Sequence, residues 1–262
     1  VAAAELPQMS SAIGTPGEIL EKVRGRIEAG QRQIAFFIAP TTVAYLLIGD
    51  RFVAGLYETG QFGPHDTRYV WYILIGSTIG LFAATQSRLC SSAFYAMHDT
   101  KTPLWFAIIQ LVLTTVLGLL FAFPLRPAVI AFFEDVLRLP IPELREGRIA
   151  LGAAALTASA GIAAWIGYLL MRRALERRIG VVSWAAAFQA KVWGAAIVAG
   201  AGAALFSVFA VPMAIAEVGA RVHPMLTAVA VAAVFGVVYL ALTLALRVPE
   251  ARLIGRVLRR GR

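Results

Sequence analysis

The sequence predicts an all-α polytopic membrane protein with six transmembrane helices and the end of a seventh. Its 262 residues are 59% hydrophobic and only 15% charged, whereas a soluble domain carries about 25% charged residues. The mean hydropathy is +0.75. Apolar runs of about 20 residues recur, which is the length that crosses a bilayer as a helix. These runs are continuous and do not alternate with polar residues, so helices are favoured over a membrane barrel. A soluble enzyme, a disordered chain and a disulfide scaffold are excluded.

Six segments have the length and hydropathy of spanning helices. They are residues 33–55, 69–97, 104–123, 149–171, 192–212 and 226–247. Residues 1–9 resemble the end of a truncated helix, so we expect the chain to be a fragment or a processed form. The predicted organisation is therefore 1–9, three spans in 10–123, an insert at 124–148, three spans in 149–247, and a basic tail at 248–262.

The net charge of +9 would indicate nucleic acid in a soluble protein. Here the arginines lie between apolar runs, so they indicate topology and no nucleic-acid partner. Segments 10–33, 98–103, 172–191 and the residues from Arg247 onward carry 16 Lys and Arg, and the opposite side carries seven. This bias predicts a cytoplasmic C-terminus.

Two segments outside the spans suggest surface elements. Residues 128–138 place apolar and charged side chains on opposite faces, which predicts an amphipathic helix on the outer membrane surface or a loop helix covering the bundle. The basic tail could bind anionic membrane lipid or remain solvated.

Small residues recur at four-residue spacing in two of the later spans. Ala153, Thr157 and Gly161 form one such series, and Ala196, Gly200 and Ala204 form another. This spacing lets helices approach closely.

Residues that could carry chemistry are scarce. The three histidines lie in different predicted loops without metal-ligand spacing. The single cysteine, Cys90, cannot form an intrachain disulfide. There is no phosphate-binding glycine loop and no nucleophile elbow. We therefore expect no enzyme, no catalytic residue, no bound metal and no cofactor.

Arg88 is the strongest candidate for a functional residue. It is predicted near the middle of the second span, beside Thr85, Gln86 and Ser87. A charge at bilayer depth is costly and usually faces a bundle interior or a watery cavity, and a guanidinium suits bidentate binding of phosphate. Snorkelling toward the end of the helix is the alternative. Pro40 is expected to bend the first span.

Four stretches carry a family resemblance. They are LPQMS at 6–10, FFIAP at 36–40, GLYETGQF at 55–62 and AFYAMHDTKTP at 93–103. In order and spacing, residues 1–123 resemble the MurJ/MviN family of lipid II flippases, within the multidrug/oligosaccharidyl-lipid/polysaccharide exporter superfamily. Beyond residue 123 only the hydropathy pattern agrees.

The resemblance implies one lobe of a two-lobe, fourteen-helix transporter in the bacterial inner membrane. This chain would hold the end of the eighth helix and helices nine to fourteen, and its partner would be the missing N-terminal lobe of the same protein. The family moves the undecaprenyl-pyrophosphate-linked peptidoglycan precursor to the outer leaflet by alternating access. The insert at 124–148 departs from the short turn that is usual in the family.

The resemblance also implies roles for individual residues. Arg88 would face the pyrophosphate, with Gln86 and Thr85 beside it as further substrate-binding residues. Asp99, Lys101 and Pro103, in the connection between the second and third spans, would hinge or gate together with Pro40. A tight helix–helix turn without a moving role is the alternative for that connection.

Three other functions remain open. The first is a flippase for another lipid-linked oligosaccharide, such as an O-antigen or capsule unit. The second is an ion-coupled drug antiporter, although no Asp or Glu lies near the middle of any predicted span. The third is a membrane scaffold that does not transport.

Overall fold

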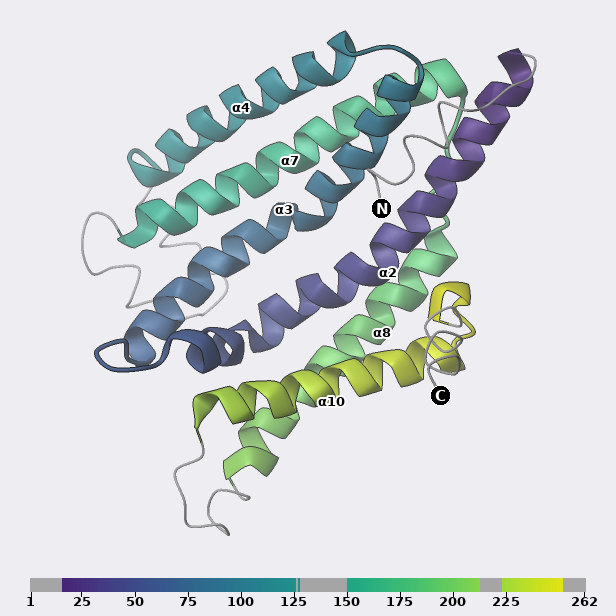
Figure 1. Cartoon of the computed structure of the whole chain (residues 1–262). Helices are drawn as coiled ribbons and strands as arrows, with labels where there is room; N and C mark the ends of the chain where they lie inside the picture. The colour runs from purple at the N-terminus through teal and green to yellow at the C-terminus, as the bar shows by residue number, and fades with distance from the viewer. Residues whose placement is uncertain (1–15, 126, 128–149, 213–222, 252–262) are drawn as a thin grey trace. The chain divides into compact units, whose positions relative to one another are not determined.

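The computed structural model describes residues 16–125, 127, 150–212 and 223–251 (Figure 1). These residues form long α-helices, and no strand occurs among them. The helices are α2 (Pro16–Tyr57), α3 (Pro64–Ala96), α4 (Lys101–Ala122), α7 (Ala150–Ile179), α8 (Ala186–Leu205) with the π-helical turn η2 (Phe206–Ala210), and α10 (Pro224–Ala245).

The six predicted spans are confirmed as helices. Within the part of the chain that the structure describes, six helices are long and apolar enough to cross a membrane. Residues 1–9, the helix predicted at 128–138 and the tail beyond Ala251 lie outside the described residues.

Two predicted connections are partly helical. Segment 10–33 was expected to precede the first span, but α2 begins at Pro16 and continues through the predicted span to Tyr57. Likewise, α7 extends from the predicted span to Ile179. Hydropathy detects only the part of a helix that suits lipid, and charged residues do not stop a helix once it leaves the apolar layer.

The fold comprises two compact units, the first with residues 1–34 and 72–185 and the second with 35–71 and 186–262. In the first unit, α3 packs against α7 through glycine. A Cβ built on Gly80 would lie 2.5 Å from the Cα of Gly161, and Gly76 lies directly against Thr157. The Thr157–Gly161 spacing therefore serves close helix approach, as predicted.

The first unit also contains the first part of α2 and the helix α4, and α4 packs against α7. A Cβ on Gly118 would meet Leu156 at 2.7 Å, and the Ser159 hydroxyl lies 3.2 Å from the carbonyl oxygen of Thr114. Most of α4 is otherwise exposed, with Trp105 65% and Leu111 67% exposed.

The second unit is built on the later part of α2, with α8 and α10 packed around it. A Cβ on Gly200 of α8 would lie 2.7 Å from both Val43 and Leu47, so the second predicted series of small residues also marks a close approach. Its buried core includes Phe36, Ala196, Phe235 and Tyr239.

Candidate functional site

Arg88 lies on the exposed surface of α3. It precedes Ala96, the last residue of α3, by eight residues, which is about 12 Å along the helix. It therefore lies in the last third of α3, and the prediction that it lies near the middle is wrong. The helix begins earlier than hydropathy alone indicated. No residue in the described ranges forms an ion pair or hydrogen bond with Arg88.

Arg88 shares its face with polar side chains. Ser77 and Tyr95 are also exposed, and they lie 11 and 7 residues from Arg88, close to whole numbers of helical turns. Thr85 is partly buried, and its hydroxyl donates to the carbonyl of Leu81 at 2.8 Å. The hydrogen bond of Thr85 is thus made within its own helix.

Gln86 lies on a different face from Arg88. Its side chain is completely buried, and residues two positions apart do not face each other on a helix. Neither its amide oxygen nor its amide nitrogen has a hydrogen-bond partner among the described residues. The structure does not bring together the three residues predicted to bind substrate.

The connection between α3 and α4 is held by Asp99. Its carboxylate accepts hydrogen bonds from the backbone N–H of Lys101 at 3.1 Å, and from the backbone N–H and hydroxyl of Thr102 at 3.0 and 2.7 Å. Arg178, near the end of α7, forms a 2.7 Å ion pair with the same carboxylate and lies over the Phe94 ring. The Thr102 hydrogen bonds, aided by Arg178, hold the pKa of Asp99 below its ordinary value of 3.8.

Lys101 and Pro103, the other two residues of this connection that were expected to hinge or gate, occupy ordinary helix-start positions. Pro103 is buried in the first turn of α4, where its missing N–H leaves no intrahelical bond unmade, and the Lys101 side chain is exposed. This geometry is that of a tight turn whose carboxylate is also tied to α7.

Pro40 frees a backbone carbonyl inside α2. Its missing N–H would have bonded the carbonyl of Phe36, four residues earlier. The Tyr239 hydroxyl of α10 donates to that carbonyl at 2.7 Å. The bend-prone part of α2 is thus bonded to α10.

The segment that follows α7 was missed by the sequence analysis, which predicted an ordinary connection at 172–191. Residues 180–185, here called the returning segment, run back beside α7. The Trp184 ring lies 6.3 Å from that of Tyr168, although Tyr168 precedes Ile179 by 11 residues, about 16 Å of helix. Figure 1 shows this thin stretch between the end of α7 and the start of α8.

Charged side chains satisfy the backbone of the returning segment and of the end of α7. Arg24 donates to the carbonyl of Ile179, and Arg172 donates to that of Val182 at 2.9 Å. The backbone N–H of Ser183 donates to the Glu28 carboxylate at 2.9 Å. Non-helical backbone beside a spanning helix needs such partners.

Aromatic rings fix the other end of the returning segment. Trp184 lies 6.2 Å from Phe82 and 6.3 Å from Tyr168 between ring centroids. The Arg172 guanidinium lies 4.7 Å from the Trp184 ring centroid. Phe82 lies in α3, far from Trp184 along the chain, while Tyr168 and Arg172 lie on the preceding helix, so the three contacts form only because the chain turns back along α7.

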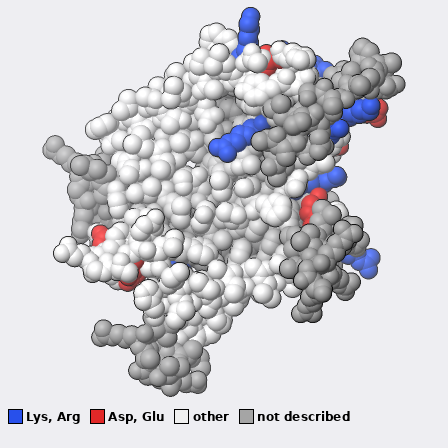
Figure 2. All heavy atoms as spheres, in the orientation of Figure 1, with Lys and Arg blue, Asp and Glu red and all other residues white. Residues whose placement is uncertain are grey.

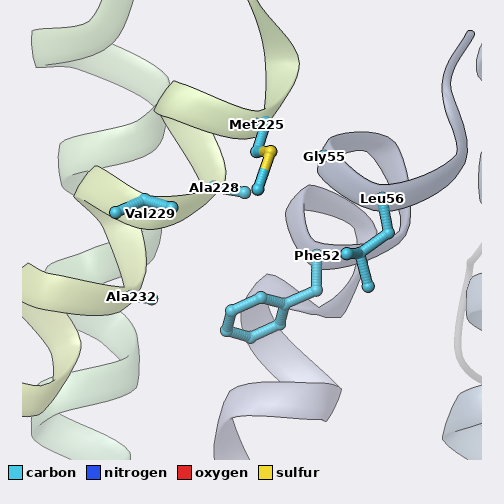
Figure 3. Close-up of a pocket in the computed structure, with 7 residues that line it drawn as sticks. All are labelled: Phe52, Gly55, Leu56, Met225, Ala228, Val229 and Ala232. Atoms are coloured by element: carbon cyan, nitrogen blue, oxygen red, sulfur yellow. The ribbon is translucent and has the colours of Figure 1, made fainter.

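The second unit contains a small apolar pocket of about 150 Å³. Figure 3 shows it between the end of α2 and the start of α10. It is lined by Phe52, Gly55, Leu56, Met225, Ala228, Val229 and Ala232. These residues offer no charged or polar side chain to a phosphate or sugar.

Basic side chains gather at one end of the first unit. The described Lys and Arg residues of this unit, apart from Arg88, lie in the first part of α2, at the start of α4 and near the end of α7. In Figure 2 most of the visible Lys and Arg side chains lie toward the upper right of the view. No group of three or more His, Cys, Asp and Glu that could hold a metal ion occurs among the described residues.

A family model described as "Lipid II flippase MurJ" matches residues 1–135. Among curated relatives, the probable lipid II flippase MurJ of Rhizobium tropici is 32% identical over 103 residues, covering 39% of this chain and 19% of that protein. The protein of the same name from Vibrio cholerae is 28% identical over 93 residues, covering 36% and 18%. The chain thus matches less than a fifth of the length of these relatives.

A solved structure titled "Lipid II flippase MurJ, inward closed conformation" has a similar fold. The TM-score is 0.64 at 16% identity, and the match covers 94% of this chain and 42% of that chain. The likeness therefore extends over almost all of the chain, including the part beyond the family-model match.

Proposed function

Because the chain belongs to the lipid II flippase MurJ family, we propose that it forms one lobe of a transporter that moves lipid II to the outer leaflet of the bacterial cytoplasmic membrane. The match to 42% of a solved relative supports a single lobe, since six of fourteen helices are a similar share. The other lobe would come from the same protein.

Arg88 carries this proposal. Lipid II has a pyrophosphate, and a guanidinium can bind phosphate oxygens in bidentate geometry. Arg88 is exposed on a spanning helix without a described partner, and such a charge is costly in lipid. A hydrated cavity completed by the other lobe would remove this cost and place the guanidinium on the substrate path.

The neighbours of Arg88 receive different roles. Thr85 borders the exposed face and could contact the polar head of the substrate. Gln86 is buried on another face, so we assign it to helix packing within the lobe in place of the substrate contact that the sequence suggested.

The basic end of the first unit is proposed to face the cytoplasm, together with the C-terminus. The 16-to-7 distribution of Lys and Arg in the sequence supports this orientation. On this orientation the Asp99–Arg178 ion pair lies on the cytoplasmic side, where it would hold α3, α4 and α7 together while Pro40 allows α2 to bend.

Genetic rescue tests the proposed function. The lipid II flippase of a bacterium is depleted, the complete protein that contains this chain is supplied, and survival is scored. We expect rescue by the wild type and by Arg247→Ala, which removes an exposed arginine beyond the end of α10. Failure of a well-inserted wild type to rescue would contradict lipid II transport.

A further inference from the structure

We propose that Arg173 and Arg177 of α7 bind the phosphate of an anionic phospholipid of the surrounding bilayer. This lipid is a resident partner and not the transported substrate, so the inference goes beyond the proposed function. It rests on the different environments of four arginines near the end of α7.

Two of these four arginines interact with other residues of the chain. Arg172 contacts Glu176, Val182 and Trp184, and Arg178 pairs with Asp99. By contrast, Arg173 and Arg177 are exposed, and no residue within the described ranges forms a hydrogen bond or ion pair with either.

Arg173 and Arg177 share one face of the helix. They are four residues apart, so their side chains lie one turn, or about 5.4 Å, from each other. Like charges at this spacing repel. A phosphate between them would remove the repulsion and accept hydrogen bonds from both guanidinium groups.

The same face is apolar closer to the middle of α7. Leu169 and Ile166 are 47% and 37% exposed and precede Arg173 by one and two turns. On this proposal the exposed apolar face of α7 packs against lipid acyl chains, and the helix end beyond it lies at the headgroups. Along this face the apolar side chains would contact the acyl chains of a phospholipid, and the two arginines would contact its phosphate.

The occupant is a phospholipid with net negative charge, such as phosphatidylglycerol. Two cations that form no ion pair with any residue of the described ranges favour an anionic headgroup over a zwitterionic one. Guanidinium groups, which can bind two oxygens at once, also predict that arginine is preferred to lysine here.

Native mass spectrometry of the purified protein tests the proposal. The protein is reconstituted in vesicles of phosphatidylcholine with a minority of phosphatidylglycerol, extracted gently, and its retained lipids are counted. We expect the wild type to retain phosphatidylglycerol, and Arg173→Gln with Arg177→Gln to lower the retained ratio of phosphatidylglycerol to phosphatidylcholine about five- to tenfold.

Matched controls separate a site from general attraction. Lys191→Gln with Arg247→Gln removes the same charge from exposed positions elsewhere and should leave the ratio unchanged. Arg173→Lys with Arg177→Lys keeps the charge and should show an intermediate loss. An equal fall in the control pair, or no preference in the wild type, would overturn the proposal. Lipid II is absent from this assay, so its outcome is independent of the transport test.

Discussion

The Tyr239 hydroxyl donates a 2.7 Å hydrogen bond to the carbonyl of Phe36, the group that Pro40 leaves without its helical donor. Both Phe36 and Tyr239 are buried. A side chain of α10 therefore supplies the hydrogen-bond donor that α2 lacks at its proline. This bond joins the proline position, which the sequence indicated, to a tyrosine that the sequence analysis did not single out.

We expect Tyr239→Phe to lower the free energy of unfolding by about 1 kcal/mol, because it leaves a buried carbonyl unpaired. The loss should shrink in a Pro40→Ala background, where residue 40 regains an N–H that can bond Phe36. Unfolding in mixed micelles, analysed as a double-mutant cycle, measures this coupling. Tyr57→Phe, at an exposed position, is the control. An equal loss of unfolding free energy in both backgrounds would show that the Tyr239 hydroxyl does not replace the missing N–H of Pro40.

The close packing of α3 against α7 predicts a severe effect at Gly80. A Cβ there would lie 2.5 Å from the Gly161 backbone, so Gly80→Ala should separate the helices and destabilise the protein by about 1–3 kcal/mol. Gly152→Ala in α7 meets nothing within 4 Å and should be neutral or slightly stabilising. Similar unfolding free energies for the two variants would refute this packing.

The returning segment depends on Gly180. Its φ is +81°, and the Arg24 guanidinium occupies the space of a side chain. Gly180→Ala should cost about 1–2 kcal/mol from its backbone conformation and should also displace Arg24 from Ile179. Hydrogen exchange at residues 180–185 should accelerate in this variant. Gly63→Ala, in open space and without a positive φ, should leave that exchange unchanged.

The depressed pKa of Asp99 predicts a specific acid sensitivity. Because the folded pKa lies below the ordinary value of 3.8, the ionised carboxylate stabilises the fold fully above that value. The contribution is lost as the pH falls through the folded pKa. Melting temperatures of the wild type and Asp99→Asn, measured between about pH 6 and pH 2.5, should converge at the acid end. A constant difference would show that the charge of Asp99 does not contribute.

The sequence was sufficient for the number and order of the spanning helices, because apolar length is a local property. It also located two close approaches, at Gly161 and Gly200, from the spacing of small residues. The sequence did not indicate that α2 begins at Pro16, since hydropathy does not detect the part of a helix that lies outside the lipid.

The returning segment was not predicted because it depends on long-range contacts. Arg24 and Glu28 are 155 residues from their partners in and beside the returning segment, so no local pattern predicts that residues 180–185 turn back along α7. The same holds for the site. The sequence drew attention to Thr85, Gln86 and Arg88 together because they are neighbours in a polar stretch. Only the structure shows which face of α3 is buried, and it places the Gln86 amide inside and the Arg88 guanidinium on the surface.

The most direct test of the central claim is the amount of lipid II exposed on the outer leaflet of cells that depend on the complete protein. Surface-accessible lipid II would be labelled or cleaved from outside and compared for wild type, Arg88→Ala, Arg88→Lys and Arg247→Ala at equal membrane levels. We expect Arg88→Ala to lower surface-exposed lipid II at least tenfold, Arg88→Lys to retain part of the wild-type amount, and Arg247→Ala to match wild type. Normal exposure of lipid II in Arg88→Ala cells would remove Arg88 from the transport path.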